Sequence, residues 1–154
     1  MKLIIIQVGK TADEYLKEGI GIYTKRIANY AELDVETVKP SLHKDKLKAM
    51  QEEEKSILSK IKQGDFLVVL DEKGEELGSR QLAAKIQKWM ERGVGRIVFI
   101  IGGAFGISPT LKKRTDFIFS VSKLTFTHQM VRLILAEQIY RSLTILRNEG
   151  YHHD

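Results

Sequence analysis

Residues 97–106 read IVFIIGGAFG, five large apolar residues followed at once by a glycine-rich turn. The apolar run does not alternate with polar residues, so we expect a strand that is buried on both faces of a sheet. Strands of this kind belong to parallel sheets that carry helices on both sides. Glycines directly after such a strand let a ligand approach the backbone closely, although a tight turn without a ligand explains the same pattern.

Similar patterns along the chain predict strands that alternate with helices. We expect further strands at residues 3–8, 33–38, 65–71 and 117–120. Helices are expected at residues 12–30, 43–62, 79–92 and 128–148, with a short one that starts at Pro109. The alternation predicts one α/β domain, residues 1–154, in which helices flank a mostly parallel sheet.

Capping and turn residues predict where several of these elements begin and end. Thr11 and Glu14 have the spacing of a capping box at the start of the first helix. Gly64 is expected to cap the second helix, and residues 72–74 are expected to form a turn. Ser108 is expected as the N-cap of the short helix, with Pro109 in its first position.

The composition excludes several classes of function. A chain of 154 residues without cysteine has no disulfide, thiolate nucleophile, thiolate zinc site or iron–sulfur cluster. The opening apolar run is too short for a signal peptide, and no run approaches the ~20 apolar residues of a membrane span, so we expect a cytoplasmic protein. The net charge of +5 favours a polyanionic partner such as RNA only weakly.

Three of the predicted strands end in unusual loops, at residues 70–74, 102–106 and 121–126. Ligands of open α/β sheets bind beyond the carboxyl ends of the strands, so these loops are the candidate binding site. The sequence has no Gly-Lys-Ser/Thr motif, and its glycine-rich turn follows the fourth strand rather than the first. Neither a P-loop nor a dinucleotide fingerprint therefore fits, and we expect a ligand that depends little on phosphate.

The last predicted helix is apolar over more than half of its circumference, which is wider than the stripe of an ordinary surface helix. Its apolar residues are Val131, Leu135, Ala136, Ile139, Tyr140, Leu143 and Leu146. A helix of this kind is buried on two sides, and we expect a second copy of the chain to cover one of them in a homodimer. Glu137 and Arg141 on its polar side have a spacing that commonly serves only to support the helix.

Histidines at two places are candidates for chemistry. His128 is expected at the start of the last helix, where a neutral imidazole serves either as a cap or in catalysis. His152, His153 and Asp154 form a terminal cluster. No third ordered ligand accompanies these histidines, so we expect no metal site.

An ordered set of motifs over the whole chain resembles the ribosomal RNA large subunit methyltransferase H family, which belongs to the SPOUT class of knotted methyltransferases. The motifs are Lys2–Lys10, Leu70-Asp71, Ile101-Gly102-Gly103, Gly106, Ser120–Phe126, His128, Glu137, Tyr140-Arg141 and Tyr151-His152. The resemblance implies a C-terminal deep trefoil knot, an obligate homodimer and S-adenosylmethionine as cofactor. It also implies methylation of N3 of a pseudouridine in large-subunit (23S) ribosomal RNA, on assembled ribosomes.

By resemblance, the cofactor contacts fall on Leu70, Gly102, Val121, Ser122, Lys123, Leu124, Thr125 and Phe126. Within this set we expect Ser122 and Thr125 to hold the loop through hydrogen bonds from their side chains to the backbone, and Lys123 to contact RNA. The chain departs from the family at Thr127, where the family usually has proline, and at Ala104-Phe105 between the glycines. Both departures leave the exact shape of these loops open.

Methyl transfer to N3 requires loss of the N3 proton, and the candidate catalytic residues are Arg141, Tyr151 and His152. Arg141 is suited to stabilise negative charge, His152 to accept a proton, and Tyr151 to stack on the target base. A helix ion pair for Arg141 and an anchor for the tail at Tyr151 are the structural alternatives. We expect the tail of one subunit to reach the cofactor site of the other.

Two other classes of function remain open from the sequence. A nicotinamide-dependent oxidoreductase would use the glycine-rich turn, although the ribose-binding acid and the fingerprint are missing. A ribosome-binding factor would keep the fold without catalytic activity. The loop and tail residues of the family are present, which favours the enzyme.

Overall fold

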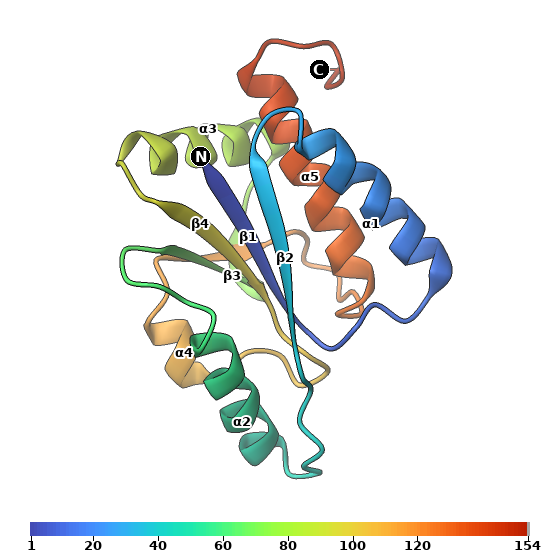
Figure 1. Ribbon diagram of the computed structural model, residues 1–154, viewed down its shortest axis with the longest axis vertical. Coiled ribbons are helices and arrows are strands. Elements are labelled where there is room, and N and C mark those ends of the chain that lie inside the picture. The colour runs from blue at the N-terminus through green and yellow to red at the C-terminus, as the bar shows by residue number, and fades with distance from the viewer. Residues whose placement is uncertain (154) are drawn as a thin grey trace.

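A five-stranded sheet forms the centre of the chain, with strand order β2-β1-β4-β3-β5 (Figure 1). The computed structural model describes residues 1–153. Its strands are β1 (Lys2–Val8), β2 (Glu32–Val38), β3 (Phe66–Glu76), β4 (Arg96–Ile101) and β5 (Phe117–Ser120), and its helices are α1 (Glu14–Ile27), α2 (Lys46–Leu58), α3 (Ser79–Glu91), α4 (Pro109–Lys113) and α5 (Met130–Leu146). Each pair of neighbouring strands runs parallel, which confirms the predicted α/β class.

The central strands β1 and β4 are buried on both faces, as their unbroken apolar runs predict. Leu3, Ile5, Phe99 and Ile101 face α1, α3 and α5 on one side of the sheet. The alternate residues, from Ile4 and Ile6 to Val98 and Ile100, face α2 and α4 on the other side. The sheet therefore lies between two layers of helices (Figure 1). In residues 1–153, no helix is both long and apolar enough to cross a membrane.

Helix α5 packs against both α1 and α3 (Figure 1). Leu135, Ala136 and Ile139 are fully buried there, while Val131 and Tyr140 on the same helix are only partly covered. Helices α1 and α3 of the same chain thus cover much of the wide apolar face of α5. The width of the face alone therefore does not require a second copy of the chain.

Two of the predicted caps are wrong, because each side chain is needed elsewhere. Helix α1 has Asp13 as its N-cap without a side-chain hydrogen bond, and the Thr11 hydroxyl instead accepts a hydrogen bond of 3.0 Å from Arg132. Helix α2 ends at Leu58, with Ser59 as its C-cap. Gly64 adopts a φ of 87° in the turn before β3, a conformation that glycine takes without strain.

The turn predicted at residues 72–74 is also wrong, since β3 continues to Glu76 and pairs with β5 on either side of a register shift between Leu70 and Glu75. Gly74 permits this close pairing, because a Cβ there would lie 2.7 Å from the carbonyl oxygen of Ile118. The start of α4 is as predicted. The hydroxyl of Ser108 accepts a hydrogen bond of 3.1 Å from the Leu111 N–H, and Pro109 occupies the first turn.

One ion pair joins the start of β4 to the residue that precedes β3. The Arg96 guanidinium donates from Nε to Asp65 Oδ1 at 2.8 Å and from Nη2 to Asp65 Oδ2 at 2.5 Å. The Asp65 side chain is only 3% exposed. Burial opposes the charge on Asp65, but the bonds from Arg96 and the Lys62 N–H outweigh burial and lower the pKa of this carboxyl.

We expect Arg96→Met to lower the free energy of unfolding by about 3 kcal/mol, because it leaves the buried Asp65 carboxylate without its cation. A carboxyl whose pKa is lowered by folding stabilises the fold above its ordinary value of 3.8, and this contribution is lost as the pH falls below it. The variant should therefore lose less stability than the unmodified chain between pH 5 and pH 3, measured by urea unfolding. Arg96→Met combined with Asp65→Asn is the control. A double variant as unstable as the single one at pH 7 would contradict the explanation.

Candidate functional site

A cavity of about 540 Å³ lies beyond the carboxyl ends of β3, β4 and β5. It is formed by the three loops that follow these strands, as the sequence predicts, together with the start of α5. Its lining residues are Lys46, Leu70–Lys73, Ile101–Gly106, Lys112, Phe119, Val121, Ser122, Leu124–His128 and Val131. The volume falls within the range of small-molecule sites, about 300–1,000 Å³.

The glycines after β4 fold the second loop back on itself. A Cβ on Gly102 would lie 2.7 Å from the carbonyl carbon of Gly106, so a larger residue there displaces the backbone. Gly106 donates a hydrogen bond of 3.0 Å to the Gly103 carbonyl and has a φ of 80°. The glycines thus form a tight turn and also line the cavity, so both interpretations of this motif apply.

Short hydrogen bonds hold the third loop in place. Ser120 donates to the carbonyl of Ser122 at 2.8 Å, and the Ser122 hydroxyl accepts from the Leu124 N–H at 3.0 Å. The role expected for Ser122 is confirmed. Thr125 differs from the prediction, because its hydroxyl donates to the Glu72 carboxylate at 2.6 Å rather than to the backbone. This bond ties the third loop to the extended end of β3.

The residue that follows Leu70 is held as a carboxylate on the cavity wall. Asp71 pairs with Lys112 from α4 and also accepts a hydrogen bond of 2.8 Å from the Lys73 N–H. Burial opposes the charge on Asp71, but Lys112 and the Lys73 N–H outweigh it and lower the pKa of the carboxyl. The pair fastens the end of β3 to α4, and the prediction from sequence did not include it among the site residues.

Seven of the eight residues predicted to contact a cofactor line this cavity: Leu70, Gly102, Val121, Ser122, Leu124, Thr125 and Phe126. Lys123 is the exception. Its side chain is 88% exposed and its ammonium group lies 3.7 Å from a Glu76 carboxylate oxygen. The loop therefore presents Lys123 outward while its neighbours face the cavity.

Thr127 and His128 connect the third loop to α5. The Thr127 hydroxyl accepts a hydrogen bond of 3.1 Å from the Met130 N–H, so threonine, where the family usually has proline, satisfies the first backbone N–H of α5. This leaves His128 free of the capping role, and its side chain lines the cavity. Burial lowers the pKa of His128, and the charge of Arg132 lowers it further, so the imidazole is neutral at pH 7.

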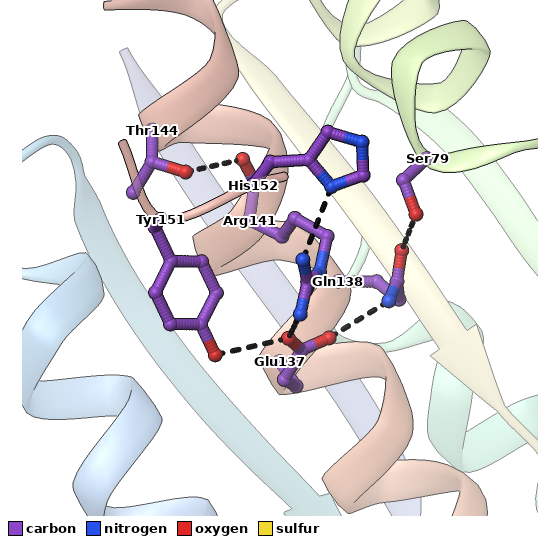
Figure 2. Close-up of polar contacts among 7 residues, drawn as sticks. All are labelled: Ser79, Glu137, Gln138, Arg141, Thr144, Tyr151 and His152. Atoms are coloured by element: carbon purple, nitrogen blue, oxygen red, sulfur yellow. Dashed lines mark hydrogen bonds and ion pairs between the residues drawn. The ribbon is translucent and has the colours of Figure 1, made fainter. Parts of the chain in front are cut away.

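The three predicted catalytic residues lie together at the other end of α5, around Glu137 (Figure 2). The Glu137 carboxylate accepts hydrogen bonds from Arg141 at 2.5 and 3.0 Å and from the Tyr151 hydroxyl at 3.0 Å. Arg141 also donates to Nδ1 of His152 at 3.1 Å. Glu137 is therefore the centre of the cluster, a role that its i,i+4 spacing to Arg141 did not reveal.

The cluster sets the protonation state of its members. The ion pair with Glu137 raises the pKa of Arg141. Burial, followed by hydrogen bonds to Tyr23 and Glu137, raises the pKa of the Tyr151 hydroxyl. Because arginine only donates, His152 accepts the bond at Nδ1 and carries its proton on Nε2 in this arrangement. Within one chain the His152 lone pair at Nδ1 is thus already engaged.

The cavity and the tail cluster are separate within one chain. None of Arg141, Tyr151 and His152 is among the residues that line the cavity. Val131 on α5 does line it, and Arg141 lies ten residues further along the helix, a rise of about 15 Å. The end of α5 accordingly lies at the end of the sheet opposite to α4 (Figure 1).

No group of three or more metal-ligating side chains occurs within residues 1–153. The predicted terminal cluster includes Asp154, which lies outside the described residues.

A family model and curated proteins that share one name match this chain over nearly its whole length. Residues 1–152 match the family model described as predicted SPOUT methyltransferase. The chain is 45% identical to ribosomal RNA large subunit methyltransferase H of Cytophaga hutchinsonii, with 99% of this chain and 100% of that protein covered. It is 41% identical to the protein of the same name from Parabacteroides distasonis, with both chains covered completely.

Solved structures with little sequence similarity share the fold. A probable methyltransferase from Bordetella pertussis superimposes with a TM-score of 0.57 at 11% identity, over 92% of this chain and 95% of that one. A probable methylase family protein from Haemophilus influenzae gives a TM-score of 0.55 at 9% identity, over 99% of this chain and 70% of that one. At these identities the similarity concerns the fold alone.

We expect Gly102→Ala to weaken binding of S-adenosylmethionine by about tenfold or more, because the added methyl displaces the loop that lines the cavity. Isothermal titration of the purified chain measures this. Gly95→Ala is the matched control, since nothing lies within 4 Å of a Cβ at that glycine. Equal affinities of Gly102→Ala and the unmodified chain would show that this loop does not contact the cofactor.

Proposed function

Since the chain belongs to the ribosomal RNA large subunit methyltransferase H family of SPOUT methyltransferases, we propose that it methylates N3 of a pseudouridine in large-subunit ribosomal RNA. Enzymes of this class use S-adenosylmethionine, and their fold threads the C-terminal part of the chain through a loop as a trefoil knot. The proposal extends to the assembled ribosome as substrate. A net charge of +5 supports binding to such a polyanion.

The cavity fits the cofactor in its chemistry. Bound S-adenosylmethionine supplies a methyl group activated by a sulfonium sulfur and carries no phosphate. The walls offer apolar side chains such as Leu70, Val121 and Phe126, together with the backbone of the glycine turn. Backbone groups and apolar surfaces suffice to bind an adenosyl group, which agrees with the absence of a phosphate motif. We assign cofactor binding to the three loops on this basis.

The single observation that carries the proposed mechanism is the separation of the tail cluster from the cavity. A site with both parts requires the tail of a second copy, so we propose a homodimer in which each cavity is completed by the partner's tail. Val131 and Tyr140, both only partly covered, are available to contact a partner. Obligate partners of this kind are commonly related by two-fold symmetry.

Within the composite site each tail residue has a distinct task. Arg141 supplies a fixed positive charge that stabilises the anion formed when N3 loses its proton. Tyr151 offers an aromatic face for the target base. His152 is suited to accept the N3 proton, provided that the bond from Arg141 to Nδ1 is released when RNA binds. Glu137 is a positioning residue, because it orients Arg141 and Tyr151.

Ribosomes from a strain that lacks the gene, incubated with the purified chain and methyl-labelled S-adenosylmethionine, test the proposed substrate. We expect label in the large-subunit RNA, and mass spectrometry of the digested RNA should identify N3-methylpseudouridine. Separated large subunits and protein-free RNA are the comparison substrates, and lower labelling of both would support the assembled ribosome. Binding to ribosomes without any label would instead favour a factor that has the fold but no activity.

Mixing two inactive variants tests the composite site. Gly102→Val is expected to destroy the cavity, and Arg141→Ala the tail cluster, so each variant alone should lack activity. After mixing and exchange of subunits in equal amounts, about half of the dimers hold one of each and have one intact site, so about a quarter of the full activity should return. Persistent inactivity of the mixture, with exchange verified by mass spectrometry, would show that each chain uses its own tail.

A further inference from the structure

A second cavity of about 300 Å³ adjoins the first, at the carboxyl ends of β1 and β2. The two cavities share the wall formed by Gly103, Ala104, Phe105 and His128. The other residues that line the second cavity are Val8, Gly9, Lys10, Pro40, Ser41, Glu53 and Gln129. The two cavities therefore lie next to each other along the glycine-rich turn.

Glu53 is the distinctive residue of this second cavity. Its side chain reaches the cavity from α2 and the residue is only 7% exposed. One carboxylate oxygen, Oε2, accepts a hydrogen bond of 2.9 Å from the Ser41 N–H. The other, Oε1, is buried and has no hydrogen-bond partner within residues 1–153. It lies 3.1 Å from the position that a Cβ would take on Gly103, so it faces the shared wall.

A buried carboxylate oxygen without a partner is costly, and the cost disappears when a donor binds to it. A positively charged N–H group is the strongest complement, because it also balances the charge. Lys10 also lines this cavity, is exposed to water, and forms no ion pair within the described residues. The cavity thus presents one negative and one positive group, which is the complement of an α-amino acid.

We propose that the second cavity binds the α-amino-acid end of S-adenosylmethionine, with Glu53 accepting hydrogen bonds from the ammonium group and Lys10 facing the carboxylate. The adenosyl end occupies the first cavity. This assignment rests on the cofactor of the family and not on the RNA substrate. The N–H edge of a target base is the competing occupant, but a neutral base offers no negative charge for Lys10.

The test compares S-adenosylhomocysteine with 5′-methylthioadenosine, which both have an uncharged thioether sulfur but differ in that only the first carries the amino-acid end. In isothermal titration of the purified chain, Glu53→Gln should weaken binding of S-adenosylhomocysteine and of S-adenosylmethionine by about tenfold or more. Binding of 5′-methylthioadenosine should stay unchanged. Lys10→Ala should weaken the two amino-acid ligands by a smaller factor, because its side chain is exposed to water.

Two controls separate this role from a structural one. Glu54→Gln changes the next residue of α2, whose carboxylate accepts a hydrogen bond from Ser108 and does not line the second cavity, so it should bind all three ligands normally. Thermal unfolding without ligand should show Glu53→Gln to be at least as stable as the unmodified chain, because the amide removes a buried charge and keeps an oxygen for the Ser41 N–H.

The outcomes distinguish the assignment from the proposed function. If Glu53→Gln binds all three ligands normally, or weakens all three equally, the assignment is wrong. If Glu53→Gln binds all three ligands normally but has a raised KM for ribosomes, the target base contacts Glu53 instead. This result would also overturn the assignment. An unmodified chain that binds S-adenosylhomocysteine better than 5′-methylthioadenosine but does not label ribosomes would refute only the proposed RNA substrate. Failure to bind any of the three would refute the cofactor itself.

Discussion

The parallel pairing of β1 with β4 at the centre of the sheet is the constraint on which the rest depends. Both strands are buried on both faces, so the whole sheet is built around them. Because every neighbouring strand runs in the same direction, the carboxyl ends of all strands meet at one edge. The two cavities follow from this, since loops that leave the same edge necessarily converge there. Helix α5 starts at this edge and carries the tail to the other.

Two buried charged residues, Arg132 and Glu53, lie near the cavities. Arg132 is 2% exposed, and it donates to the carbonyl of Val8 at 2.7 Å and to Thr11. These bonds attach the end of β1 and the following loop to α5, and so hold in place the segment that lines the second cavity. Glu53 approaches the same cavity from α2, on the other layer of helices. Buried charges of this kind contribute little to stability, so their place beside a ligand cavity indicates a role in binding.

The sequence was sufficient to predict features that depend on local patterns and insufficient for those that depend on distant partners. Unbroken apolar runs located the strands, and strand ends located the three loops of the first cavity. The capping box at Thr11 failed because a residue of α5 uses that hydroxyl, and the turn at residues 72–74 failed because β5 pairs with it. Glu53 stands between Glu52 and Glu54 in a helix rich in lysine and glutamate, and no local signal separates the buried carboxylate from its less buried neighbours. The resemblance to a family selected Arg141, Tyr151 and His152, but only the structure showed that Glu137 joins them and that they lie far from the cavity.

The rigidity of α5 explains why a second copy is the more favourable way to unite the two parts of the site. Its buried residues, from Leu135 to Leu143, pack between α1 and α3 and against the sheet. For a tail to reach the cavity of its own chain, the last turns of α5 would have to unwind and expose Ile139 and Leu143, at a cost of about 2 kcal/mol for each large side chain. In the homodimer that we propose, the partner's tail completes the cavity without any such loss. The packing that buries α5 therefore favours the shared site over a closed one within a single chain.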